Sequence, residues 1–313
     1  MLLDLILFVV GFYILIKGSN FLVNGASSLA RNLGISSFII GLVIVGIGTS
    51  IPELAITFLG NLVGDVDIGI GTLVGSNTFN ILFILGVSAM FFPLAFKVEW
   101  EDDVLWNLFA LIVVFTFLFY FGSNEISRIE GLILLALFAG WLYVSIKTPL
   151  VSDETEEPLR VLAFPIAIAM VAAGFLGVIL GAKWVVDGAE VIARSLGMPE
   201  AIIGLTLVGI GTSLPEFVVT FTAAFRKQPG IAVGNIIGSN VVNFLLIFGA
   251  AAIARPILMP QGIASDLLGA AGSVTLLYVF MYWGARCVLE RWQGAVLVLG
   301  YISYVLYILA RVG

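Results

Sequence analysis

Histidine is missing from this chain of 313 residues, which removes the commonest transition-metal ligand and the side chain that titrates nearest to neutral pH. Without it, neither the zinc-binding motif of metalloproteases nor a Ser-His-Asp triad can form. The single cysteine, Cys287, cannot form a disulfide within the chain. The net charge of −6 gives no basic stripe for nucleic acid. We therefore expect neither an enzyme nor a nucleic-acid partner, and the sequence shows no motif for an organic cofactor.

Charged residues are also scarce, at 11% of the chain, where a soluble domain carries roughly 25%. Hydrophobic residues make up 61%, which predicts an integral multi-pass protein of the lipid bilayer. A span needs about 20 mostly apolar residues. The first segment lacks a positively charged leader, so we expect a retained helix rather than a signal peptide. We expect ten spans, at 2–30, 36–61, 67–92, 103–121, 126–146, 161–193, 199–224, 230–254, 265–285 and 292–310.

Two nearly identical octapeptides lie 163 positions apart. Residues 46–53 read GIGTSIPE and residues 209–216 read GIGTSLPE. Each is followed, at the same offset, by a motif that begins Gly-Ser-Asn and ends in asparagine, at 75–80 and 238–243. Between 39–53 and 202–216, 12 of 15 positions are identical, so the chain contains an internal repeat.

Each half holds five predicted spans, which is an odd number, so the second half must enter the membrane from the opposite side. The predicted fold is an all-α membrane protein of ten transmembrane helices, arranged as two inverted-topology five-helix repeats. The first repeat covers 1–146, a linker covers 147–160, and the second repeat covers 161–313. Lysine and arginine favour the linker side by eight to four, which predicts a cytoplasmic linker, both termini outside, and a location in the plasma membrane.

Each octapeptide places a helix break beside a carboxylate. Pro52 and Pro215 have no amide hydrogen, so each leaves a carbonyl four residues earlier without its helical partner. A carboxylate within a span costs about 3 kcal/mol to insert and marks a functional site. Each break should therefore offer backbone carbonyls, two hydroxyls and one carboxylate. These come from Gly46, Thr49, Ser50 and Glu53 in the first half, and from Gly209, Thr212, Ser213 and Glu216 in the second.

The motifs that follow add further oxygen atoms. Ser76 and Asn80 are four positions apart, as are Ser239 and Asn243, so each pair lies on one face of a helix. All of these donors are oxygens, and Ca²⁺ takes 6–8 oxygen ligands. The sequence predicts a site for Ca²⁺ or Na⁺ rather than for zinc or copper. The glycine that opens each motif (Gly75, Gly238) is expected to allow close helix approach, and the first asparagine (Asn77, Asn240) to bind a neighbouring helix or backbone.

This arrangement resembles the cation/Ca²⁺ exchanger superfamily, the sodium/calcium and proton/calcium antiporters. The resemblance covers the whole chain in span count and is strongest in the two repeats, each with Gly-Thr-Ser-x-Pro-Glu and then Gly-Ser-x-x-x-Asn. It implies a secondary antiporter that exchanges Ca²⁺ for Na⁺ or H⁺ by alternating access, as the two long first spans slide past the rest. Glu53 and Glu216 would bind the ions, with oxygens from Thr49, Ser50, Ser76, Asn80, Thr212, Ser213, Ser239 and the residue at 243.

One position departs from the sodium-coupled members, several of which carry aspartate where Asn243 stands. Two ionised glutamates neutralise one Ca²⁺, two Na⁺ or two H⁺, and a third monovalent ion would leave excess charge in a low-dielectric site. Asp187 or Glu190 could supply another carboxylate, although a helix-end or gate role is the alternative for Asp187. The counter-ion, its stoichiometry and the oligomeric state are left open.

Other interpretations are a cation channel, an exchanger for a different cation, or an intramembrane enzyme that uses the two glutamates as acid and base. A channel usually has its axis along the membrane normal, whereas this repeat is inverted. In the structural alternative, the glutamates satisfy helix ends and the asparagines hold helices together. Lys17 and Lys183 are expected to extend toward the membrane surface.

Overall fold

The computed structural model describes residues 2–63, 66–119, 125–147, 161–198, 209–260, 262–285 and 287–312, and these residues are almost entirely helical. The predicted linker lies outside the described residues beyond position 147, as do residues 199–208 of the predicted span at 199–224. The chain divides into two compact units. Unit 1 comprises 1–52 and 151–235, and unit 2 comprises 53–150 and 236–313. Each unit therefore draws on both sequence halves.

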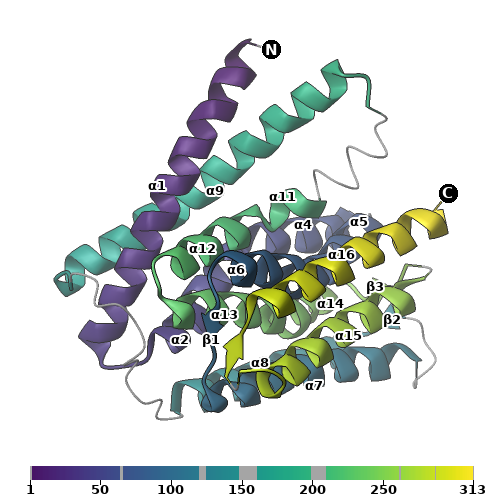
Figure 1. Ribbon diagram of the computed structural model, residues 1–313. Coiled ribbons are helices and arrows are strands. Elements are labelled where there is room, and N and C mark those ends of the chain that lie inside the picture. The colour runs from purple at the N-terminus through teal and green to yellow at the C-terminus, as the bar shows by residue number, and fades with distance from the viewer. Residues whose placement is uncertain are drawn as a thin grey trace. The chain divides into compact units, whose positions relative to one another are not determined.

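Unit 1 contains two long helices that pack side by side, α1 (Leu2–Leu33) and α9 (Phe164–Ser195) (Figure 1). Each has 32 residues and is roughly 48 Å long at 1.5 Å per residue, which exceeds the roughly 30 Å core of a bilayer. The helices run antiparallel, because early residues of one meet late residues of the other. A Cβ atom on Gly11 would lie 3.1 Å from the Gly181 carbonyl oxygen, and one on Gly25 would lie 2.9 Å from that of Ala167.

Glycines hold these two helices close together. Gly18 and Gly181 occupy equivalent positions in the two halves, and neither has room for a side chain. A Cβ on Gly18 would approach the Val178 nitrogen to 2.7 Å, and one on Gly181 would approach the Leu15 nitrogen to 2.6 Å. Each of the two helices therefore contributes an equivalent glycine to the close contact between α1 and α9.

Both long helices end at a glycine with a left-handed backbone. Gly34 has φ +67° and Gly197 has φ +75°, a conformation that glycine adopts without steric cost. Beyond each glycine the chain turns back on the helix, since the Ile35 nitrogen donates to the Ala30 carbonyl and the Met198 nitrogen donates to the Ala193 carbonyl, both at 3.1 Å. This pattern is a Schellman-type C-cap.

The rest of unit 1 consists of shorter helices around the two octapeptides. They are α2 (Ser37–Ile39), η1 (Ile40–Val45), α3 (Gly46–Thr49), α11 (Gly209–Thr212), α12 (Leu214–Phe225) and the first part of α13 (Pro229–Val241). The segment at 37–45 packs closely on α13, because a Cβ on Gly234 would lie 2.5 Å from the Phe38 carbonyl oxygen.

Unit 2 holds the remaining elements from both halves. From the first half come most of α4 (Ile51–Val63), α5 (Val66–Phe79), η2 (Asn80–Leu85), α6 (Gly86–Phe91), β1 (Leu94–Ala95), η3 (Val98–Trp100), α7 (Glu101–Phe119), β2 (Glu125–Ile126) and α8 (Arg128–Lys147). From the second come the end of α13, η5 (Val242–Ile247), α14 (Phe248–Ala254), β3 (Ile257–Leu258), α15 (Ile263–Tyr282), β4 (Val288–Leu289) and α16 (Arg291–Val312).

Within unit 2, elements of the first sequence half pair with elements of the second. Strand β1 pairs antiparallel with β4, and β2 pairs antiparallel with β3, so each short ladder joins one strand from each half. The helices follow the same rule, because α8 packs on α14 and α16 packs on α6. The contacts match in detail: a Cβ on Gly131 would lie 2.9 Å from the Gly249 carbonyl oxygen, and one on Gly294 would lie 2.5 Å from that of Gly86.

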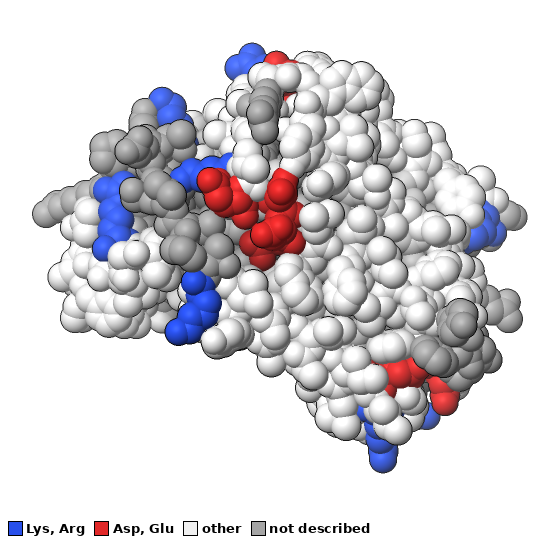
Figure 2. All heavy atoms as spheres, turned by 90° about the horizontal axis from the view of Figure 1, so that it is seen from below, with Lys and Arg blue, Asp and Glu red and all other residues white. Residues whose placement is uncertain are grey.

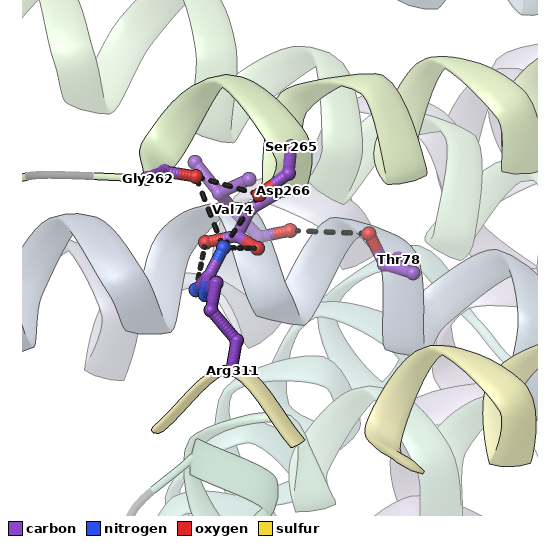
Figure 3. Close-up of polar contacts among 6 residues, drawn as sticks. All are labelled: Val74, Thr78, Gly262, Ser265, Asp266 and Arg311. Atoms are coloured by element: carbon purple, nitrogen blue, oxygen red, sulfur yellow. Dashed lines mark hydrogen bonds and ion pairs between the residues drawn. The ribbon is translucent and has the colours of Figure 1, made fainter. Parts of the chain in front are cut away.

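An acidic residue near the start of α7 and of α15 ties each helix to the helix that follows it. Asp103 accepts hydrogen bonds from Trp141 Nε1 at 2.9 Å and Ser145 Oγ at 3.0 Å. Asp266, which lies 163 positions after Asp103, pairs through both carboxylate oxygens with Arg311 at 3.0 and 3.1 Å (Figure 3). The equivalence of the two halves therefore extends to their fourth and fifth helices, although the partner chemistry differs.

Eight described helices are long and apolar enough to cross a membrane, and a bent pair, Ser37–Thr49 with Ile51–Val63, makes up to nine. The predicted span at 199–224 is described only from Gly209 onward, where α12 is a shorter apolar helix. Ten transmembrane helices are therefore not established within the described ranges. On the face drawn in Figure 2, charged side chains gather in a few small groups and most of the surface carries none, as expected for a protein surrounded by lipid.

Candidate functional site

Both octapeptides break their helix at the serine. Helix α3 ends before Ser50, and α4 begins after it. Helices α11 and α12 flank Ser213 in the same way. The backbone angles are φ −81° and ψ 7° at Ser50, and φ −90° and ψ 6° at Ser213, in a sparsely populated region where many active-site residues lie. The predicted breaks before Pro52 and Pro215 are confirmed.

In unit 1, the break of the first half meets the glutamate of the second. Ser50 Oγ donates to Glu216 Oε1 at 3.4 Å, and each residue is 1% exposed. Next to Ser50, the Thr49 hydroxyl lies 3.1 Å from the Val45 carbonyl oxygen and 3.4 Å from that of Gly46. Hydroxyls, backbone carbonyls and a carboxylate are thus shielded together from solvent. The two other predicted hydroxyl residues of this unit, Thr212 and Ser213, are also buried.

In unit 2, the two motif asparagines use their nitrogens and leave their oxygens available. Asn80 Nδ2 donates to Asn240 Oδ1 at 2.9 Å, and Asn243 Nδ2 donates to Ser76 Oγ at 3.4 Å. Among the described residues, neither Asn80 Oδ1 nor Asn243 Oδ1 accepts a hydrogen bond. A buried amide oxygen without a donor is costly, and a bound cation would offset that cost. Glu53 and Ser239, the other predicted ligands in this unit, are buried as well.

The predictions for the other motif residues, which are not proposed ligands, were confirmed for the asparagines but not for Gly75. Asn240 binds the adjacent helix as predicted, since its Nδ2 donates to the Asn77 carbonyl at 3.2 Å. Asn77 binds backbone, the other form of the same prediction, since its Nδ2 donates to the Leu73 carbonyl of its own helix at 2.9 Å. The prediction of close packing at Gly75 is wrong, because a Cβ there would meet none of the described atoms within 4 Å. In the first octapeptide, a Cβ on Gly48 would overlap the Phe175 ring.

The acidic residues of α9 are engaged with basic residues on the same helix. Asp187 pairs with Lys183 at 3.0 Å, and Glu190 pairs with Arg194 at 2.6 Å. More than half of the Lys183 and Asp187 side chains is exposed. Neither acid therefore behaves as a buried ligand in this structure. Among the described residues, no group of three or more acidic or cysteine side chains gathers around a common point.

Sequence reasoning missed two features of the site. The first is Asn235, which is fully buried in unit 1 and hydrogen-bonded to Thr49 Oγ1. Its equivalent in the first half is Thr72, so a search for shared residues could not find it. The second is a set of π-helical turns: η1 directly precedes α3, η2 begins at Asn80, and η5 contains Asn243. Such turns are frequent at functional sites.

A family model described as sodium/calcium exchanger protein matches the chain twice, over residues 3–147 and 166–310. The chain belongs to this family. The two matched segments begin 163 residues apart, which is the offset that relates the two sets of motifs. Members of this family are integral membrane transporters rather than enzymes.

Individual relatives match over most of their length. The sodium/calcium exchanger MaX1 of Methanosarcina acetivorans is 29% identical, and the alignment covers 96% of this chain and 97% of the relative. The inner membrane protein YrbG of Escherichia coli (strain K12) is 34% identical over 82% of this chain and 81% of its own. A solved structure of the sodium-calcium exchanger NCX_Mj, soaked with Na⁺ and Ca²⁺, has a TM-score of 0.84 and 30% identity, with 97% and 98% of the two chains covered.

Proposed function

We propose that this protein is a secondary antiporter that exchanges Ca²⁺ for Na⁺ by alternating access at a site containing Glu53 and Glu216. The observation that carries this proposal is the contact of Ser50 with the Glu216 carboxylate. Two residues, Ile51 and Pro52, separate Ser50 from Glu53, so the chain itself keeps the first glutamate near the break that contacts the second. The names of the family and of MaX1 support the choice of ions.

The proposed ligands are all oxygens. The two carboxylates supply the charge, and the unused amide oxygens of Asn80 and Asn243 add neutral ligands. Hard, oxygen-rich sites of this kind suit Ca²⁺ and Na⁺. The remaining proposed ligands are the hydroxyls of Thr49, Ser50, Ser76, Thr212, Ser213 and Ser239 and the carbonyls of Gly46 and Gly209.

The two glutamates account for obligatory exchange. Two ionised carboxylates in a low-dielectric site are costly unless cations neutralise them. The empty site, with a charge of −2, should therefore reorient slowly, whereas a site filled by one Ca²⁺ or by two Na⁺ is neutral. Under this proposal the protein moves Ca²⁺ in one direction only as it moves the counter-ion in the other.

The proton is the second candidate counter-ion, because position 243 is an asparagine rather than a third acid. Two protons on Glu53 and Glu216 would neutralise the site as well as two Na⁺ would. A Na⁺ gradient and a pH gradient, imposed separately on proteoliposomes, distinguish the two ions by which gradient drives ⁴⁵Ca²⁺ uptake. Uptake without any counter-ion on the opposite side would instead identify a channel.

We further propose that the halves are inverted repeats of five transmembrane helices, with both termini outside and the linker in the cytoplasm. The antiparallel pairing of α1 with α9 supports the inversion, since these are the equivalent first helices of the two halves. The exchanged strand pairs support it too, because a two-fold axis converts β1 with β4 into β3 with β2. Cysteine labelling of intact cells at either terminus tests the orientation.

A further inference from the structure

Asn235 links the two octapeptides within unit 1. It lies in α13, is fully buried, and hydrogen-bonds through both ends of its amide. Its Oδ1 lies 3.0 Å from Thr49 Oγ1, in the first motif. Its Nδ2 donates to the Glu216 carbonyl at 3.3 Å, in the second motif, and to Thr220 Oγ1 at 2.9 Å. One side chain therefore fixes the positions of two breaks that are remote in sequence.

The bond to Asn235 determines which acceptor receives the hydroxyl hydrogen of Thr49. A hydroxyl group has one hydrogen to donate and two lone pairs, yet Thr49 Oγ1 has three acceptors within reach: Asn235 Oδ1 and the carbonyls of Val45 and Gly46. Asn235 offers the shortest of the three distances. When the hydrogen points to Asn235, neither carbonyl accepts from this hydroxyl, although the Gly46 carbonyl still accepts from the Ser50 nitrogen at 3.3 Å.

The amide nitrogen of Asn235 holds the helix that carries the second glutamate. Glu216 lies in the first turn of α12, and its backbone carbonyl accepts from Asn235 Nδ2. The bond to Thr220, one turn later on the same helix, makes a second attachment. Two attachments restrict rotation of the helix segment that carries the Glu216 carboxylate.

This link differs between the two halves. The position equivalent to Asn235 is Thr72, and a threonine hydroxyl has one donor where an amide has two donors and a carbonyl acceptor. Thr57, the equivalent of Thr220, donates to the Gly69 carbonyl at 3.2 Å. The helix that carries Glu216 therefore has an amide attachment for which the sequence of the first half offers only a threonine.

We infer that Asn235 is a positioning residue for cation binding: it draws the Thr49 proton away from the carbonyls of the first break and holds the helix that carries Glu216. This inference rests on the proposed function. It predicts that Asn235 acts on Ca²⁺ affinity through Thr49, so that the effects of changing the two residues are not independent.

A double-mutant cycle of Thr49→Val and Asn235→Leu, read by equilibrium ⁴⁵Ca²⁺ binding to the purified full chain in detergent, tests the inference. Loss of a buried hydrogen-bond partner should weaken Ca²⁺ binding about tenfold in each single variant. Because Asn235 acts in part through Thr49, the double variant should bind clearly less than a hundredfold more weakly than the wild type, short of the product of the two single losses. A weakening near a hundredfold in the double variant would overturn the inference, as would binding by Asn235→Leu within twofold of the wild type.

Asn61→Leu is the matched control, combined with Thr49→Val in the same way. Asn61 is equally buried and donates to the Ala251 and Arg255 carbonyls in unit 2, so its effect should be independent of Thr49. If Asn235→Leu does not give folded protein, Asn235→Thr, which copies the residue of the first half, takes its place. Wild-type Ca²⁺ binding by Glu216→Gln would contradict the proposed function itself, whereas independent effects at Thr49 and Asn235 would contradict this inference alone.

Discussion

Ser50 and Glu216 are 166 positions apart in sequence, and the Ser50 hydroxyl lies 3.4 Å from a Glu216 carboxylate oxygen in a buried part of unit 1. The contact joins the helix break of one half to the acid of the other. It is made by a residue whose backbone lies in a sparsely populated region, in a chain that belongs to the sodium/calcium exchanger protein family. Under the proposed function, this contact orients oxygens around the transported cation.

Ser50→Ala should raise the KM for Ca²⁺ about tenfold while the protein remains folded, because hydrogen bonds to charged groups contribute about 1.5–3 kcal/mol. The measurement is the concentration dependence of ⁴⁵Ca²⁺ uptake in proteoliposomes. Ser303→Ala is the control, since Ser303 is bonded to the Leu299 carbonyl of its own helix on an exposed face. Equal KM values for the two variants would count against a role of Ser50 in the site.

Exchange should be electroneutral, because two carboxylates balance one Ca²⁺ or two monovalent cations. A K⁺ diffusion potential set with valinomycin should therefore leave the rate of Na⁺-driven ⁴⁵Ca²⁺ uptake unchanged in the wild type. Asn243→Asp adds a third acid beside Ser76, which allows a third Na⁺ to be neutralised, so uptake by this variant should depend on the potential. Potential-dependent uptake by the wild type would show that another charge takes part.

Gly18→Ala should destabilise the protein by about 1–3 kcal/mol, the usual cost of overpacking. A Cβ there would lie 2.7 Å from the Val178 nitrogen on the opposite helix. Gly140→Ala is the matched control, because a Cβ at Gly140 would meet no described atom within 4 Å; replacing a glycine within a helix should then stabilise it by roughly 0.5–1 kcal/mol. Thermal unfolding in detergent compares the two. A Gly18→Ala variant as stable as Gly140→Ala would refute the close packing of α1 on α9.

Arg311→Ala should lower the stability by about 1–2 kcal/mol, because it leaves the Asp266 carboxylate, which is largely buried, without its two-point partner. The loss is limited because the Arg311 side chain is 31% exposed. Lys183→Ala removes a far more exposed pair, with Asp187, and should change the stability by less than about 1 kcal/mol. Unfolding temperatures of the two variants in the same detergent test the difference. Equal losses would indicate that the Asp266 pair is no stronger than a surface pair.

The sequence was sufficient to locate the helix breaks and the buried acids. Pro52 and Pro215 disrupt helices through local chemistry, so their effect does not depend on what packs nearby. The two long helices, in contrast, extend to Leu33 and Ser195, beyond the predicted span ends at 30 and 193. The repeat identified which residues correspond, and the buried motif residues Asn80 and Asn243 followed from it.

The sequence did not predict which strands, helices and side chains contact one another. The pairing of β1 with β4 is decided by packing between the halves, which two-residue strands do not encode locally. Asn235 escaped notice because its equivalent is Thr72, and Gly75 was misjudged because a glycine in a helix does not reveal which neighbour approaches it. Asp103 and Asp266 correspond in sequence, yet one is held by Trp141 and the other by Arg311.

The most direct test of the proposed site is Na⁺-driven ⁴⁵Ca²⁺ uptake into proteoliposomes that contain the wild type, Glu53→Gln or Glu216→Gln. Glutamine keeps the size of the side chain and removes its charge, so the site can no longer be neutralised by one Ca²⁺. We predict rapid uptake by the wild type and none above background by either variant, at equal amounts of folded protein. Uptake at the wild-type rate by either variant would contradict the assignment of the two glutamates as the ion-binding pair.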